Sequence, residues 1–156
     1  MSALYFATAA KSAVGLVRAG NEDSALTSRS LVAVADGMGG HAAGEVASRI
    51  AITTLAKESE VFTNKDVDTE SADDLFSSSL LAIDTTISEY SIENPELAGM
   101  GTTLSALFLR DGAVAALHIG DSRIYRLRGN TLEQLSTDHT VIQELLDQGA
   151  ITEADI

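Results

Sequence analysis

The chain has 156 residues, of which 45% are apolar, and its 23 acidic and 10 basic side chains give a formal net charge of −13. This length and composition suit one domain with a real core, and the acidic balance argues against nucleic acid or an anionic membrane surface as a partner. Cysteine is absent, which excludes disulfides and thiolate zinc sites, and the sequence contains neither a signal peptide nor an apolar run of the roughly 18 residues needed for a membrane span, so we expect a cytoplasmic location.

The first half of the sequence predicts two strands followed by two helices. Residues 3–10 begin with a strand-like composition, and the continuously apolar run at 30–35 is typical of a buried strand. Apolar residues then recur at helical spacing, which predicts helices at about 43–57 and 73–91. We expect these helices to form an antiparallel pair on one sheet. The acidic and polar stretch at 64–74 between them predicts a surface loop.

The second half of the sequence predicts short strands. Its β-type runs are TTLSALFL, AVAALHI, RIYRLR and TLEQL, and the segments between them are Arg110-Asp111-Gly112, Gly120-Asp121 and Gly129-Asn130. Such segments are typical of hairpin turns, so we expect an antiparallel meander and an α+β fold. Residues 139–149 predict a short helix with Gly149 as its C-cap, and Thr152 is expected to cap a further helix.

Three aspartates, Asp23, Asp36 and Asp121, stand where an apolar strand meets a turn. Four glycines follow Asp36 within eight positions, and a glycine lets a backbone carbonyl or a ligand come close. Asp36 and the carbonyl of Gly37 can therefore supply oxygen ligands to Mg²⁺ or Mn²⁺, with Asp36 bridging a pair of ions. Taken singly, each aspartate is as readily explained as a turn residue or a helix cap.

Four stretches, in the order GLVRAGNEDS, VAVADGMGGHAAGEVAS, GMGTTLSALFL and LHIGDSRIYRLR, together resemble the PPM metal-dependent protein serine/threonine phosphatases (protein phosphatase 2C family). They look most like the bacterial branch, and actinobacterial members in particular. The resemblance implies a β-sandwich of two antiparallel sheets flanked by helical hairpins, with metals at one end between the sheets. It also implies that a metal-bound hydroxide hydrolyses phosphoserine and phosphothreonine at a centre of two or three Mn²⁺ or Mg²⁺ ions.

The resemblance also implies the catalytic residues. Arg18 matches the arginine that holds the substrate phosphate, and Asp36 matches the aspartate that bridges two metals. Gly37 matches the residue whose carbonyl is a ligand to one of them. Many eukaryotic relatives have a histidine directly after this Asp-Gly pair as a general acid, but the present sequence has Met38 there, as other bacterial members do.

The remaining metal shell is incomplete. By resemblance, Glu22 and Asp23 match acidic residues that hold metal-bound waters, and Asp121 matches the carboxylate of a third, weaker metal site. The family completes its metal pair with two further aspartates, from Ser-Asp-Gly and Asp-Asn motifs, which have no counterpart in this sequence. We therefore expect residues 1–156 to be the N-terminal two-thirds of one catalytic domain, ending in the flap segment. A complementary C-terminal fragment or another copy is then expected as a partner.

The other partners implied by the resemblance are phosphorylated proteins, namely bacterial serine/threonine kinases and their substrates. Actinobacterial relatives often carry a transmembrane segment after the catalytic domain, so the parent protein can be tethered to the inner face of the membrane. An alternative is that the chain is a catalytically incomplete fragment that acts only as a metal- or protein-binding piece.

Two short motifs in the sequence also occur in other enzyme classes. Residues 37–42 fit the G-x-G-x-x-A fingerprint of dinucleotide-binding domains, but no second parallel strand follows at the required distance. Ser122 lies in a Gly-Asp-Ser sequence found in some esterases, with Asp138 and His139 as candidate partners. That motif usually opens the esterase fold, whereas here it comes late. His118, within an apolar run, is expected to be a structural histidine.

Overall fold

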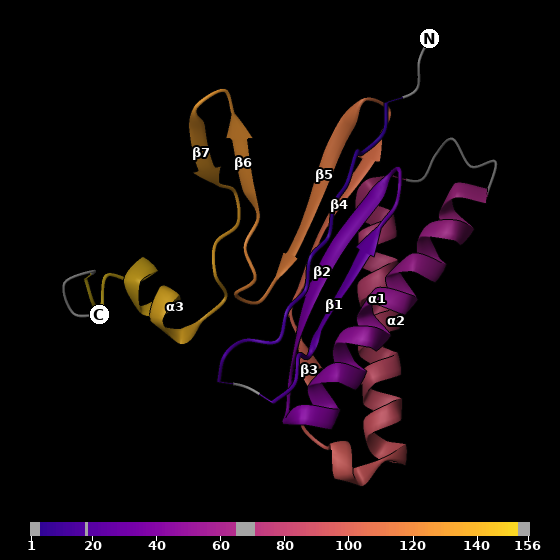
Figure 1. Cartoon of the computed structure of the whole chain (residues 1–156), viewed down its shortest axis with the longest axis vertical. Helices are drawn as coiled ribbons and strands as arrows, with labels where there is room; N and C mark the ends of the chain where they lie inside the picture. The colour runs from indigo at the N-terminus through magenta and orange to yellow at the C-terminus, as the bar shows by residue number, and fades with distance from the viewer. Residues whose placement is uncertain (1–3, 18, 65–70, 153–156) are drawn as a thin grey trace.

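The computed structural model describes residues 4–17, 19–64 and 71–152, which form antiparallel sheets and helices (Figure 1). Arg18 and residues 153–156 lie outside the described residues, and so does the helix expected after Thr152. In chain order the elements are β1 (Asp23–Thr27), β2 (Leu31–Met38), α1 (His41–Asn64), α2 (Ala72–Glu93), the 3₁₀ turn η1 (Pro95–Leu97), β3 (Gly101–Thr102), β4 (Leu104–Arg110), β5 (Ala113–Ile119), β6 (Tyr125–Arg128), β7 (Thr131–Gln134) and α3 (Val141–Asp147).

The strands form two antiparallel sheets, which confirms the expected α+β class. One sheet has the order β1-β2-β4-β5, with β3 paired to the end of β2, and the other is the β6-β7 hairpin. Two of the three expected hairpin turns connect paired strands, at Asp111-Gly112 and at Gly129-Asn130. The prediction for Gly120-Asp121 is wrong, because β5 and β6 belong to different sheets. Local turn chemistry cannot distinguish a hairpin from a crossing between sheets.

The N-terminal segment is not the strand that its composition indicated. Residues 4–14 form no regular element, although the Phe6 N–H donates to the carbonyl of Arg29 at 2.8 Å. Residues 7–11 instead line a cavity with β1, β2 and β4. These side chains are small or polar and exposed, and the segment lies beside the sheet without joining it as a strand.

The two long helices cover one face of the larger sheet as an antiparallel pair (Figure 1). Both are longer than expected. Helix α1 continues to Asn64 because residues 58–64 contain no glycine or proline to end it. Helix α2 begins with a capping box, in which the Ser71 hydroxyl accepts from the Asp74 N–H and the Asp74 carboxylate accepts from the Ser71 N–H. Among the described residues, no helix is long and apolar enough to cross a lipid bilayer.

The core lies between this helix pair and the sheet. Along β2, buried and more exposed residues alternate, so one face of the strand points at the helices and the other points away from them. Phe76 of α2 meets Phe108 of β4 edge to face, with 6.4 Å between ring centroids. The core residues are Leu31, Ala33, Ala35, Ala51, Ile52, Leu55, Leu75, Phe76, Ile83, Leu104, Ala106 and Phe108.

Candidate metal centre

Two of the predicted carboxylates face each other across neighbouring strands. Asp23 of β1 is the register partner of Asp36 of β2, and both side chains are exposed on the sheet face away from the helices. Directly opposite residues in an antiparallel pair have Cβ atoms about 5 Å apart, and like charges there repel each other. A cation between the two carboxylates removes this repulsion.

The backbone of Asp36 is held from the other side of the strand. Its N–H donates to the Thr103 hydroxyl at 2.9 Å, and its carbonyl accepts from the Thr103 N–H at 2.9 Å and from the Thr102 hydroxyl at 3.0 Å. These bonds come from β3 and the residue after it, which lie more than sixty positions away in the sequence. Strand pairing therefore places Asp36 before any ligand binds.

Two glycines permit the close approach of β2 and the start of α1. A Cβ on Gly37 would overlap the carbonyl group of Gly44, and a Cβ on Gly44 would overlap the Glu22 carboxylate. The Gly37 N–H also donates to the Glu22 carbonyl at 3.2 Å. The glycine-rich turn thus packs strand against helix and brings Glu22 to the end of β2, next to the Asp23–Asp36 pair.

A cavity of about 280 Å³ opens at this place. Asp23 and Asp36 line it together with Lys11, Ser12 and Ser122. Lys11 is the one cationic side chain among the described residues that line it, and sequence reasoning missed it because no pattern marks an isolated lysine in an irregular segment. Asn21, whose amide donates to the Ser12 hydroxyl at 2.6 Å, ties this segment to the start of β1.

Asp121 lies on a separate turn that is bonded to the same region. The neighbouring Ser122 hydroxyl lies 2.7 Å from the Thr103 hydroxyl, which also accepts from Asp36. The His139 N–H donates to the Gly120 carbonyl at 2.8 Å, and the Gly120 N–H donates to His139 Nδ1 at 3.3 Å. Within the described part of the chain, however, no three acidic or histidine side chains gather into one metal-binding cluster.

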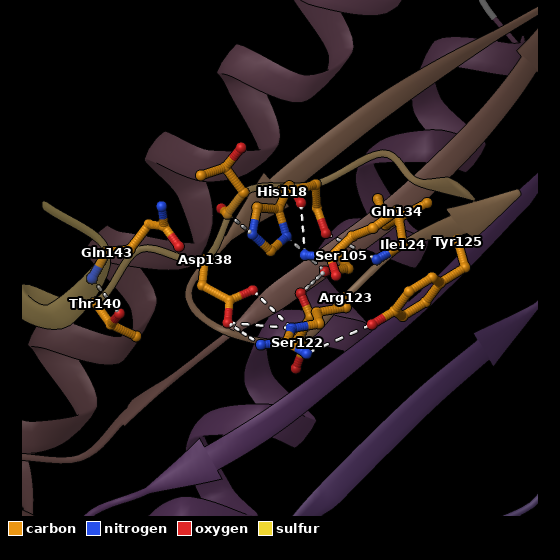
Figure 2. A network of polar contacts seen from close by, with 12 residues as sticks. Ser105, His118, Ser122, Arg123, Ile124, Tyr125, Gln134, Asp138, Thr140 and Gln143 are labelled. Carbon is orange, nitrogen blue, oxygen red and sulfur yellow. Dashed lines mark hydrogen bonds and ion pairs between the residues drawn. The ribbon is translucent and has the colours of Figure 1, made fainter. Parts of the chain in front are cut away.

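A polar network anchors this turn to the sheet (Figure 2). The Ser105 hydroxyl and His118 Nδ1 are 2.9 Å apart, and His118 Nε2 donates to the Thr137 carbonyl at 3.0 Å. His118 is therefore a structural histidine, as expected. Arg123 donates to both carboxylate oxygens of Asp138, at 2.6 to 3.1 Å, and these hydrogen bonds lower the pKa of Asp138.

These contacts argue against the serine hydrolase alternative. The Ser122 hydroxyl pairs with Thr103, and Asp138 is bound to Arg123. His139 uses its Nδ1 to accept from the Gly120 N–H. A nucleophile, base and orienting acid are thus not assembled from these three residues.

The donor chemistry of the site fits a hard divalent cation. Asp23 and Asp36 present carboxylate oxygens at one cavity, and such cations bind six or more oxygen ligands. The described residues supply only part of such a shell.

Comparisons with known proteins give one consistent result. The model of the family described as protein phosphatase 2C matches residues 20–148. The serine/threonine protein phosphatase PstP of Mycobacterium tuberculosis is 44% identical over 147 residues, which cover 92% of this chain and 27% of that protein. The serine/threonine phosphatase stp of Listeria welshimeri is 36% identical over 150 residues, covering 90% of this chain and 58% of that protein.

Solved structures agree with the sequence comparisons. A crystal structure of M. tuberculosis PstP superposes with a TM-score of 0.83 at 42% identity, covering 94% of this chain and 60% of that chain. The catalytic domain of PstP in complex with two manganese ions superposes with a TM-score of 0.82 at 42% identity, covering 94% of this chain and 62% of that chain. The present chain thus spans less than two thirds of each of these proteins.

Proposed function

Because the chain belongs to the protein phosphatase 2C family, we propose that its activity is the metal-dependent hydrolysis of phosphoserine and phosphothreonine in proteins. The observation that supports it best is the Asp23–Asp36 carboxylate pair, which lines one cavity and favours a cation there by its charge. Mn²⁺ or Mg²⁺ is the proposed cofactor, since PstP binds two manganese ions in its crystal structure.

Each predicted site residue has a proposed task. Asp36 and the Gly37 carbonyl would hold the metal pair, and Asp121 would contribute to a third site. Glu22 and Asp23, which lie beside Asp36, would accept hydrogen bonds from water around the ions. When bound, the ions supply positive charge beside the phosphoryl oxygens and acidify water for attack on phosphorus.

The substrate phosphate needs local positive charge, because the chain carries a net charge of −13. Arg18 is the proposed phosphate ligand, since a planar guanidinium can donate two parallel hydrogen bonds to a phosphate group. Lys11 places a positive charge at the cavity lined by Asp23 and Asp36. We expect these two residues and the ions, rather than the protein surface as a whole, to attract the phosphorylated side chain.

The proposed partners are phosphorylated proteins, among them bacterial serine/threonine kinases and their substrates. A complementary C-terminal fragment or another copy of the chain is the proposed source of the missing metal ligands. We further propose a cytoplasmic location, with a tether at the inner face of the membrane in the parent protein.

The test is hydrolysis of a phosphothreonine peptide by the 156-residue chain in millimolar Mn²⁺ and then in excess chelator. We expect turnover that chelator abolishes and that Asp36→Ala removes, while Asp84→Ala, on the exposed surface of α2, leaves it unchanged. Mn²⁺ binding is followed in parallel by electron paramagnetic resonance. Binding without turnover would favour the alternative function of a metal-binding piece, and turnover that resists chelator would refute the proposed chemistry.

A further inference from the structure

Thr103 lies between the two segments that carry the candidate ligands Asp36 and Asp121. It follows β3 directly, and its hydroxyl and its backbone N–H bond to these two segments. The hydroxyl accepts from the Asp36 N–H at 2.9 Å and pairs with the Ser122 hydroxyl at 2.7 Å, and the backbone N–H donates to the Asp36 carbonyl at 2.9 Å. One side chain therefore connects the end of β2 with the Asp121 turn.

The Thr103 hydroxyl is the group that makes this connection. A hydroxyl oxygen that accepts from the Asp36 N–H still has its own proton and a second lone pair. It can therefore either donate to the Ser122 hydroxyl or accept from it. Replacing the hydroxyl by a methyl group removes its hydrogen bonds with the Asp36 N–H and with the Ser122 hydroxyl at the same time. The hydroxyl of Thr102, its neighbour, donates instead to the carbonyls of Asp36 and Thr103.

The methyl group of Thr103 fits against the same turn. Gly120 has a φ of +97°, and a Cβ placed on it would lie 2.6 Å from Thr103 Cγ2. Behind the turn, the Ser122 carbonyl accepts from the Ser105 hydroxyl at 3.2 Å, and Ser105 is paired with His118 (Figure 2). The turn is thus held on one side by the sheet and on the other by Thr103.

We propose that the Thr103 hydroxyl is a positioning group that sets the Asp121 turn relative to Asp36, and through that geometry the affinity of the centre for Mn²⁺. Thr103 touches no reacting atom and acts through the two aspartates. The part of this inference that concerns Mn²⁺ rests on the proposed function. The part that concerns geometry does not.

The test compares four variants of the 156-residue chain. Thr103→Val removes the hydroxyl at nearly constant volume, and Thr103→Ser restores it without the methyl group. Ser122→Ala removes only the partner on the Asp121 turn. Thr131→Val makes the same chemical change on the exposed strand β7, far from the site, and serves as the matched control.

The first measurement uses metal-free protein. Nuclear magnetic resonance follows the amide exchange rate of Asp36 and the amide chemical shift of Asp121. We expect Thr103→Val to speed Asp36 exchange by about tenfold and to shift the Asp121 signal. Ser122→Ala should shift Asp121 and leave Asp36 protected, since Asp36 keeps its acceptor. Thr103→Ser keeps the hydroxyl, so Asp36 exchange should stay slow, and the Asp121 signal should shift less than in Thr103→Val because only the methyl contact with the turn is lost. Thr131→Val should match the unsubstituted chain in both readouts.

The second measurement is the Mn²⁺ dissociation constant. Removing a group that orients a metal ligand typically weakens affinity by about 10- to 100-fold, and we expect a loss in this range for Thr103→Val, with recovery in Thr103→Ser. Unchanged Asp36 exchange and Asp121 shift in Thr103→Val would overturn the inference, and so would equal losses in the valine and serine variants. If Thr103→Val does not fold, Ser122→Ala still tests the inference, because an Asp121 signal that does not move in this variant refutes the link between Thr103 and the Asp121 turn.

A failure of the proposed function gives a different result. In that case the unsubstituted chain shows no Mn²⁺-dependent hydrolysis, while the chemical shifts of the metal-free variants still change.

Discussion

Gly37→Ala tests the packing of strand against helix on which the candidate centre depends. A Cβ on Gly37 would lie 2.8 Å from the Gly44 Cα and nearer still to the Gly44 carbonyl, whereas ordinary carbon contacts begin at 3.4 Å. Both groups are backbone, so the start of α1 must move away from β2 by more than half an ångström. Overpacking of this kind costs about 1 to 3 kcal/mol of folding free energy, and the rigid backbone favours the upper end.

The smaller entropy of an unfolded chain with alanine offsets part of this loss, by about 0.4 to 1 kcal/mol. The net expectation is a loss of about 2 kcal/mol, which lowers the urea midpoint by about 1 M when the denaturant slope is about 2 kcal/mol per M. The assay is urea unfolding followed by circular dichroism. Gly15→Ala is the matched control, because a Cβ there meets no atom within 4 Å, and it should lose no stability and gain at most about 1 kcal/mol from the same entropy effect. A Gly37→Ala midpoint equal to that of Gly15→Ala would refute the close-packing argument.

Three further predictions concern the core, a helix cap and an ion pair. Leu55 is fully buried, so Leu55→Ala should lose about 2 to 5 kcal/mol in the same urea assay, while Leu81→Ala, at a side chain that is 70% exposed, should change stability by less than about 0.5 kcal/mol. Ser71→Ala removes the hydroxyl that accepts from the Asp74 N–H in the capping box of α2 and should lower stability by about 1 kcal/mol. The Ser71 backbone N–H is the larger cause of the lowered Asp74 pKa and remains in the variant, whereas the hydroxyl is the smaller cause and is lost. A nuclear magnetic resonance titration should therefore show the Asp74 pKa rising only part of the way to its ordinary value, and full loss of the shift would contradict the backbone half of the cap. Arg123 lowers the pKa of Asp138, so this pair stabilises the fold above the unfolded aspartate pKa of about 4, and the contribution is lost as the pH falls through the lower folded value. The urea midpoint is measured as a function of pH. In Arg123→Gln it should fall less steeply at acid pH than in the unsubstituted chain, and an unchanged slope would show that the pair contributes nothing.

Local patterns in the sequence were enough to predict several elements correctly. The continuous apolar run at 30–35 predicted β2, and Asp36, which directly follows this run, was predicted as a metal ligand. Helical spacing predicted both long helices, because burial of one face imposes a period of 3.6 residues whatever the rest of the fold. Four motifs in order also predicted the family, since each carries several residues at a set spacing.

Contacts between residues that are far apart in the sequence could not be predicted from local patterns. The sequence gives no sign that Thr103 donates to and accepts from Asp36, or that Lys11 lines the cavity of Asp23 and Asp36. Nor does it distinguish the turn at Gly120-Asp121, which passes between sheets, from the two that close hairpins. A turn signal reports backbone angles over a few residues, whereas neighbours in a sheet depend on which strands pair.

The sequence by itself therefore determined the residue types of the candidate centre and the elements that carry them. Only the tertiary structure decided which of them meet. It placed Asp23 opposite Asp36 by the register of β1 and β2, and it joined the Asp121 turn to Asp36 through Thr103. The physical reason is that hydrogen bonds between distant segments form only after the sheet order β1-β2-β4-β5 has brought those segments together.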